Sequence, residues 1–255
     1  MIRSPLIIAH RGASRHAPEN TLAAIRLAVG SGADGIEIDL RLSKDGIPVV
    51  IHDADLLRTG GINKKVREMS ASELAKADVG SWFDRKYVRR SNPSFGGETV
   101  PLIDDVLELL ADFEGLLYLE LKGQKREART LVDAVCTRIC RSPLLPRIIV
   151  KSFDLDAIQL VRSQLPNVQT AALFGPDVRH LFKRRRYLVD LARQNGADQL
   201  SVHRSLVTRG LMHAANLVKM PVVVWTVDDM RWINKARKLG IAALTTNDPS
   251  ALGKR

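Results

Sequence analysis

The first strand–helix–strand unit of the chain reads LIIAHRGASRHAPENTLAAIRLAVGSGADGIEIDLRL, which spans residues 6–42. Residues 6–9 form a short apolar run of the kind that makes a buried strand. A helical pattern follows from about residue 20, and glycines end it near residue 30. Residues 36–42 alternate apolar and polar side chains, which is the two-residue period of a strand. This order predicts two parallel strands joined by a crossover helix.

The same alternation continues to the end of the chain. Helical patterns lie between the apolar runs, for example at residues 155–163 and 178–195. Further strands are expected at residues 116–121, 148–151, 169–174, 199–202, 222–225 and 242–245. With the first two strands this makes eight, and 255 residues is the usual length of one barrel of eight strands and eight helices. We therefore predict the α/β class and a single-domain (β/α)₈ TIM barrel over residues 1–255.

Two segments interrupt the alternation after the second strand. Asp45-Gly46 is a hairpin signal, and residues 48–51 are extended again. This piece is predicted to return antiparallel to the preceding strand, outside the barrel count. From about residue 55 to 100 the pattern loosens, and one short helix is expected at residues 70–77. An insertion of this length in a compact fold usually serves a function such as covering a site.

The composition is that of a globular protein with a full core. Apolar residues make up 45% of the chain and charged residues 26%. No apolar run approaches the roughly 18 residues that a membrane-spanning helix needs, and the first apolar stretch is too short for a signal peptide. We expect a mature cytoplasmic protein. Cys136 and Cys140 are expected to be buried thiols on one helix, because a pair four residues apart has poor disulfide geometry.

The chain carries a formal net charge of +11. This excess could favour anionic partners such as phosphate esters, nucleic acid or an acidic membrane surface. Solvated helix faces explain it more simply, and no aromatic residues interleave with the clusters as in nucleic-acid binders. We expect no nucleic-acid partner and no transmembrane segment; weak contact with a membrane surface and the oligomeric state stay open. The clusters are Lys183 to Arg186, Arg89-Arg90, and Lys235, Arg237 and Lys238.

In a barrel of this kind, active-site residues collect at the carboxyl ends of the strands. Glu37 and Asp39 lie two residues apart on one strand, so their side chains face the same way. Two such carboxylates repel each other unless a cation neutralises them, and Glu120 on the next parallel strand could supply a third. Three carboxylates select one hard divalent ion, Mg²⁺ or Ca²⁺. The alternative is that the acids only form ion pairs with Arg41, Lys122 or Arg11.

Two histidines at the same rim suit acid–base chemistry, because imidazole titrates near neutral pH. His10 ends the first strand and His52 ends the hairpin return. One can take a proton from an attacking hydroxyl while the other protonates the leaving alcohol, and Asp53 could orient one of them. Arg11 and Lys122 can neutralise a phosphate.

Some strand-end residues leave two interpretations open. Phe153 and Trp225 either wall a substrate pocket or pack in the core. Gly12 either allows close backbone approach to an anion or serves a turn. The remaining histidines are expected at the rim, at the surface or in packing: His203, His16, His180 and His213.

Several short motifs follow one another in order along the chain. They are His10-Arg11-Gly12, Pro18-Glu19-Asn20-Thr21, Glu37-Ile38-Asp39, His52-Asp53, Glu120-Leu121-Lys122, Ser152-Phe153, Trp225-Thr226-Val227, and the run from Pro101 to Leu107. The ordered set resembles the glycerophosphodiester phosphodiesterase family. The resemblance implies a TIM barrel with a small insertion, a divalent metal held by the three acids, and the two histidines as the catalytic pair. It also implies hydrolysis of a glycerophosphodiester to glycerol 3-phosphate and an alcohol.

The leading hypothesis is thus a phosphodiesterase of small glycerophosphodiesters, such as those of choline or ethanolamine. A lysophospholipase D is the alternative enzyme, with an apolar groove lined by Trp82, Phe83 and Phe95 of the insertion. A barrel without catalysis that binds anions or membranes is the third reading. The sequence also departs from the family at Asp228, where asparagine is common, and at Asn247 in the final motif, and both departures bear on substrate fit.

Overall fold

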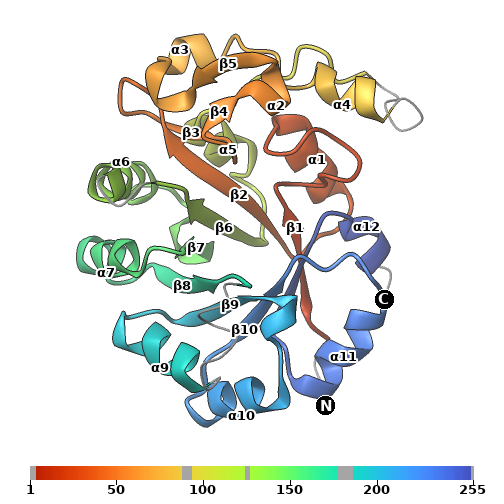
Figure 1. Cartoon of the computed structure of the whole chain (residues 1–255), viewed down its shortest axis with the longest axis vertical. Coiled ribbons are helices and arrows are strands. Elements are labelled where there is room, and N and C mark those ends of the chain that lie inside the picture. Colours follow the sequence, from red (N-terminus) through yellow and green to blue (C-terminus); the bar gives the residue numbers. More distant parts are fainter. Residues whose placement is uncertain (1–3, 88–93, 124–126, 177–185, 254–255) are drawn as a thin grey trace.

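The computed structural model describes residues 4–87, 94–123, 127–176 and 186–253. Eight parallel strands close into a barrel in the order β1, β2, β6, β7, β8, β9, β10 and β11, and β11 pairs with β1 (Figure 1). The strands are β1 Leu6–His10, β2 Gly35–Leu42, β6 Leu116–Leu121, β7 Ile148–Ser152, β8 Gln169–Phe174, β9 Gln199–His203, β10 Val222–Trp225 and β11 Ala243–Thr246. The predicted (β/α)₈ barrel is confirmed.

Helices on the outside surround the barrel (Figure 1). The side chain of Thr21 accepts a hydrogen bond from the amide of Ala24 and caps the first helix. The predicted helix at residues 178–195 is observed from Arg186; its earlier residues, with His180 and Lys183 to Arg185, lie outside the described residues, as do Arg89 and Arg90. The helices are α1 Leu22–Gly30, α5 Ile103–Leu109, α6 Ala128–Ile139, α7 Leu155–Gln164, α9 Arg186–Gln194, α10 Arg209–Leu217, α11 Arg231–Leu239 and α12 Pro249–Leu252, with the 3₁₀ helices η3 Leu145–Arg147 and η4 Arg204–Leu206.

The insertion lies beside α1 and the carboxyl end of β2 (Figure 1). It starts from β3 Pro48–Val50, which pairs antiparallel with β2 as the hairpin signal predicts. The insertion holds more structure than the single helix expected. It buries one small apolar cluster together with β3, and in a second cluster its Phe83 and Phe95 pack with Ala17 and with Ala24 of α1. Its elements are β4 Asp55–Leu56, α2 Leu57–Gly60, β5 Ile62–Lys65, η1 Val66–Glu68, α3 Ala71–Leu74 and α4 Ser81–Lys86.

The interior of the barrel is filled by one layer of side chains from alternate strand positions. This layer consists of Ile8, Tyr118, Ile149, Ala171, Val223 and Ala243. Because side chains alternate along a strand, the residues two positions further on also face the interior. On β1, β6 and β7 those positions hold His10, Glu120 and Lys151. The barrel core thus ends where the polar residues begin, and the site is built directly on it.

The two cysteines are free but not both buried. Cys136 lies within α6 and is buried, and burial raises the pKa of its thiol to about 12. Cys140 is exposed, so the prediction of two buried thiols is wrong for this residue. The physical reason is that Cys140 is the C-cap of α6, where the helix no longer packs on the barrel.

Within the described ranges, every helix is too short or too polar to cross a lipid bilayer.

Candidate active site

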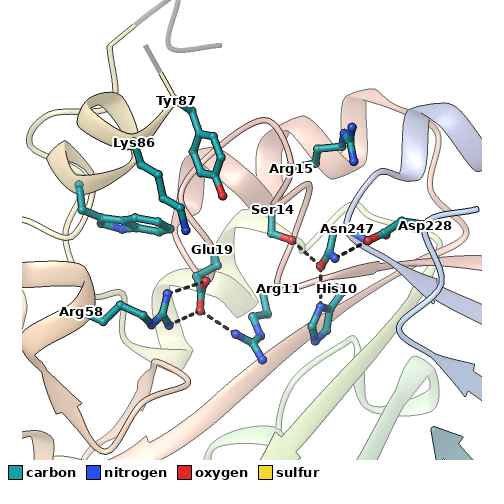
Figure 2. Close-up of a pocket in the computed structure, with 11 residues that line it drawn as sticks. His10, Arg11, Ser14, Arg15, Glu19, Arg58, Lys86, Tyr87, Asp228 and Asn247 are labelled. Carbon is teal, nitrogen blue, oxygen red and sulfur yellow. Dashed lines mark hydrogen bonds and ion pairs between the residues drawn. The ribbon is translucent and has the colours of Figure 1, made fainter. Parts of the chain in front are cut away.

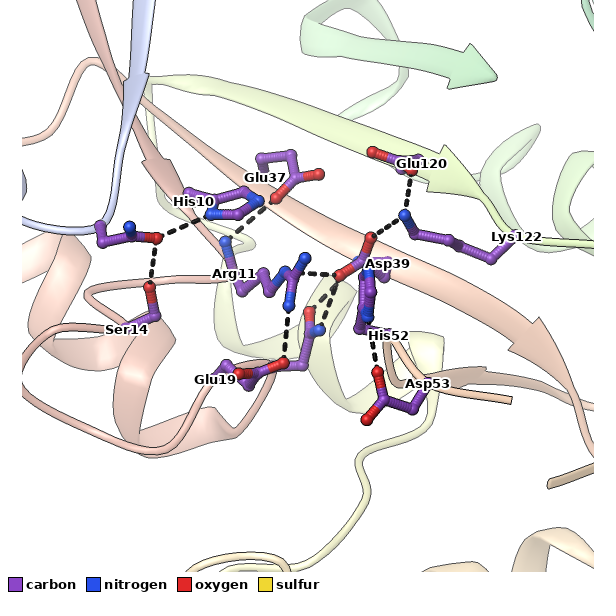
Figure 3. A network of polar contacts seen from close by, with 12 residues as sticks. His10, Arg11, Ser14, Glu19, Glu37, Asp39, His52, Asp53, Glu120 and Lys122 are labelled. Carbon is purple, nitrogen blue, oxygen red and sulfur yellow. Dashed lines mark hydrogen bonds and ion pairs between the residues drawn. The ribbon is translucent and has the colours of Figure 1, made fainter. Parts of the chain in front are cut away.

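The register of the strands brings the predicted acids and bases side by side. Glu37 of β2 lies opposite His10 of β1. Asp39 of β2 lies opposite Glu120 of β6, and Glu120 in turn lies opposite Lys151 of β7. Figure 3 shows His10, Glu37, Asp39 and Glu120 converging at the carboxyl end of the barrel.

The three acids form one buried cluster. Glu37, Asp39 and Glu120 each offer a carboxylate oxygen, and these oxygens lie within 4.8 Å of one another. Two lysines balance them. Lys151 Nζ lies 2.8 Å from Glu37 Oε1 and 3.2 Å from Glu120 Oε2. Lys122 Nζ forms ion pairs with Glu120 and, at 3.3 Å, with Asp39 Oδ1.

The donor set fits a hard divalent cation. All three ligand groups are carboxylates. One buried oxygen of each, namely Glu37 Oε1, Asp39 Oδ1 and Glu120 Oε1, makes no hydrogen bond of good geometry within the described part of the chain. Burial raises the pKa of Asp39, but the charges of Arg11 and Lys122 outweigh it and hold the pKa well below its usual value. Asp39 is therefore ionised at neutral pH and ready to bind a cation. The ion-pair alternative is also realised for Arg11 and Lys122, whereas Arg41 donates to the backbone oxygens of His52 and Lys122.

Arg11 is held in a strained loop directly above the acids. Its backbone is left-handed, with φ 58°, and its amide donates to Glu37 Oε2 at 3.0 Å. Its guanidinium lies 3.1 Å from Asp39 Oδ2 and 2.7 Å from Glu19 Oε1. Gly12 follows with φ 78°, and a Cβ there would lie 2.5 Å from the carbonyl carbon of Ala24 in α1. The glycine thus serves the turn and its packing on α1.

His10 is oriented by the final loop of the barrel. Its Nδ1 lies 2.7 Å from Asn247 Oδ1, and the amide nitrogen of Asn247 donates to Asp228 Oδ2 at 2.8 Å. Since this arrangement makes the Asn247 oxygen an acceptor, His10 carries its proton on Nδ1 and leaves Nε2 unprotonated. Desolvation lowers the pKa of His10, and the neighbouring charge of Glu37 only partly offsets this.

His52 is oriented by a carboxylate instead. Its Nδ1 lies 2.7 Å from Asp53 Oδ1, and Asp53 Oδ2 accepts a hydrogen bond of 2.6 Å from Arg58 Nε. This chain fixes the ring of His52 with Nε2 facing away from Asp53. His10 lies beside Glu37 and His52 lies beside Asp39, so the two imidazoles approach the acid cluster at different points (Figure 3).

The two predicted aromatic residues form a ledge at the rim. The rings of Phe153 and Trp225 meet edge to face with centroids 5.7 Å apart. Lys122 Nζ lies 5.9 Å from the Phe153 ring centroid, so the ledge adjoins the acid cluster. Phe153 is 49% exposed and is therefore not a core residue. The ring centroid of His203 lies 5.3 Å from that of Trp225, so His203 extends the ledge.

Sequence reasoning gave no role to several residues of the site. Asn20, at φ 60°, donates from Nδ2 to Asp39 Oδ2 at 2.9 Å and accepts from the Asp39 amide. Lys151 could have been predicted from the sequence, because it lies near the end of a strand at a position that faces the barrel interior. Glu19 stands in a quoted motif. Asn247 was expected to bear on substrate fit, but the structure places it against His10, which is 237 residues away in the chain. Arg58 lies in the insertion and had no signal.

A pocket of about 260 Å³ opens beside His10 (Figure 2). Its walls come from the loop after β1, the loops after β10 and β11, and the insertion. It is lined by His10, Arg11, Ser14, Arg15, Glu19, Arg58, Trp82, Lys86, Tyr87, Asp228 and Asn247.

Known proteins match the chain over nearly its whole length. The model of the glycerophosphoryl diester phosphodiesterase family matches residues 10–251. YhdW of Bacillus subtilis (strain 168), whose name assigns it this activity provisionally, is 32% identical over 97% of this chain and 96% of its own. A glycerophosphodiester phosphodiesterase of Caldanaerobacter subterraneus subsp. tengcongensis is 29% identical over 97% of this chain and 96% of its own. A phosphodiesterase of Oleispira antarctica, solved with the product sn-glycerol-3-phosphate, has a TM-score of 0.85 at 26% identity, covering 98% of this chain and 96% of that one.

Proposed function

The chain belongs to the glycerophosphoryl diester phosphodiesterase family and is a glycerophosphodiester phosphodiesterase, and we propose that His10 and His52 catalyse its reaction as an acid–base pair beside a metal site. The products are glycerol 3-phosphate and an alcohol. The observation that carries this proposal is the acid cluster flanked by two imidazoles, each fixed through Nδ1 by a separate partner.

Glu37, Asp39 and Glu120 would hold one divalent ion, Mg²⁺ or Ca²⁺. When bound, it supplies positive charge that stabilises the negative charge developing on the phosphate. Arg11 contributes a guanidinium held in place by Glu19 and Asp39. Lys122 adds an ammonium on a flexible stem, which can follow the phosphate oxygens through the reaction.

The histidines move the two protons that hydrolysis requires. Nε2 of one imidazole takes the proton of the attacking hydroxyl, and Nε2 of the other donates a proton to the oxygen of the leaving alcohol. Asn247 and Asp53 hold the opposite nitrogens, so each ring keeps its orientation as its charge changes.

The aromatic ledge of Phe153 and Trp225 suits the carbon chain of the glycerol half. Phe83 and Phe95 are both buried, with ring centroids 5.6 Å apart, so they cannot line an apolar groove. The insertion therefore favours small substrates over lysophospholipids. We place the whole chain, residues 1–255, in one catalytic unit, with residues 55–100 acting on substrate choice.

The test is release of the free alcohol, choline or ethanolamine, from glycerophosphocholine, glycerophosphoethanolamine and lysophosphatidylcholine, with Mg²⁺ or Ca²⁺ and after chelation. The two glycerophosphodiesters should yield glycerol 3-phosphate as the second product. We expect the water-soluble diesters to be cleaved, and chelation to abolish turnover until an ion is returned. His10→Ala and His52→Ala should each lower kcat by roughly 10²-fold or more. His213→Ala, on the exposed side of α10, is the matched control and should leave kcat unchanged.

Three results would contradict the proposal: full turnover in either site variant, full turnover in metal-free protein, or a clear preference for lysophosphatidylcholine. The last would favour the lysophospholipase D alternative.

A further inference from the structure

The pocket beside His10 is lined by charged and aromatic side chains that take no part in the proposed proton transfers. Four of its residues come from the insertion, namely Arg58, Trp82, Lys86 and Tyr87, and a fifth, Arg15, comes from the loop after β1. Figure 2 shows the side chain of Lys86 reaching down from α4 beside the ring of Tyr87. These residues stand next to His10, where one end of the substrate must lie.

The aromatic faces of this pocket are already occupied by cations of the protein. Arg58 Cζ lies 5.6 Å from the ring centroid of Trp82. Lys86 Nζ lies 5.7 Å from the same centroid and 5.2 Å from that of Tyr87. Open aromatic faces are what a quaternary ammonium group requires. A choline group would here meet two like charges instead of free rings.

The cations of the pocket differ in how they are balanced. Arg58 forms ion pairs with Glu19 and Asp53. Arg15 Nε lies 3.3 Å from Asp248 Oδ2, so this arginine is also paired with a carboxylate. Among the residues that the structure describes, no carboxylate lies within ion-pair distance of Lys86. The ammonium of Lys86 is therefore the charge that remains available to a ligand.

The chemistry of the two halves of the substrate assigns them to different walls. Glycerol carries only neutral hydroxyls on three carbons, and the ledge of Phe153 and Trp225 suits it. The charged walls of the pocket beside His10 gain more from a charged group than from the neutral hydroxyls of glycerol. We propose, on the basis of the function above, that this pocket binds the leaving alcohol and that Lys86 selects an alcohol with a second anionic group, a phosphate monoester or a carboxylate, over choline.

The test uses two diesters that differ in a single phosphate: glycerophosphoinositol and glycerophosphoinositol 4-phosphate, with glycerophosphocholine as the cationic comparison. We expect kcat/KM to be highest for the 4-phosphate, by about 3- to 10-fold over the unphosphorylated inositol diester. Lys86→Met should bring this ratio close to one and should raise kcat/KM for glycerophosphocholine. Lys76→Met is the matched control, because Lys76 is an exposed lysine of the same insertion outside the pocket, and it should keep the ratio of the unmodified protein.

A ratio of one or below in the unmodified protein, or an unchanged ratio in Lys86→Met, would overturn the proposal while leaving the proposed function intact. If no diester is cleaved, the proposed function fails instead. Calorimetric titration of the same two inositol diesters then decides the subsite. Tighter binding of the 4-phosphate that Lys86→Met abolishes would support it, and equal affinities would contradict it.

Discussion

Single charged residues at the centre of the site are balanced by partners on neighbouring strands. Lys151 is the clearest case, since its buried ammonium bridges Glu37 and Glu120. Burial alone would lower the pKa of this lysine, but the two carboxylates raise it above its usual value. Lys151 therefore stays charged at neutral pH, lowers the pKa of Glu37 and holds Glu37 and Glu120 close together.

Replacing Lys151 tests this role. Lys151→Met leaves the buried carboxylate of Glu37 without its ammonium partner and Glu120 with Lys122 alone, and breaking a buried ion pair in this way costs about 3–5 kcal/mol of unfolding free energy. A divalent ion can replace the missing charge, so the rise in Tm on adding Mg²⁺ should be larger in the variant than in the unmodified protein. Thermal melts with chelator and with saturating Mg²⁺ measure both effects. Lys44→Met, at an exposed position, is the control; an equal metal response in all three proteins would rule the idea out.

At the scale of elements, the turn between β1 and α1 determines where Arg11 stands. The turn combines a left-handed arginine with a glycine that packs directly on the backbone of α1. Hydrogen bonds from the amide of Ala13 to the oxygen of Ala24 and from the amide of Asn20 to the oxygen of Arg11 fasten it to the helix. The helix and the backbone of Arg11, whose side chain is proposed to bind the phosphate, are thus joined by hydrogen bonds on both sides of the turn.

The prediction at this scale is that Gly12→Ala disrupts the turn. The new methyl group must displace the backbone of α1, and the residue must hold a φ of 78°. Overpacking and left-handed strain together should lower the unfolding free energy by about 2–4 kcal/mol and reduce kcat/KM through movement of Arg11. Gly46→Ala is a matched control, because Gly46 has φ 75° but open space around it, so it pays only the strain of about 1 kcal/mol. Urea unfolding of both variants measures the two losses of unfolding free energy. Equal losses would show that contact with the backbone of α1 adds nothing to the cost of Gly12→Ala.

At the scale of the whole molecule, the buried acids tie stability to pH. The pKa of Asp39 and that of Glu37 are lowered in the folded protein, because cations nearby outweigh the effect of burial. An acid with a lowered pKa stabilises the fold above its unfolded pKa of about 4, and that contribution is lost as the pH falls toward the folded value. The pKa of His10 is also lowered, so protonation of this residue opposes folding below about pH 6.5.

We therefore expect the unfolding free energy of metal-free protein to decrease from about pH 6.5 downward and to fall further below pH 4. Urea unfolding at several pH values from 7 to 3.5 measures this course. Asp39→Asn removes one of the acids and should flatten the part below pH 4. Constant or rising stability over this range would show that the acids are not held ionised by their partners.

The sequence by itself determined the barrel and which strand ends carry the chemistry. Strand and helix periods are local properties, and a parallel barrel places all carboxyl strand ends at one rim, so His10, Glu37, Asp39 and Glu120 could be expected together from spacing alone. The tertiary structure decided how each of these side chains is held. Asn247 reaches His10 across 237 residues of sequence because the last strand closes the barrel on the first. No local pattern encodes such a contact, nor the position of Arg58 and Lys86, because these depend on strand register, on closure of the barrel and on how the insertion packs against α1.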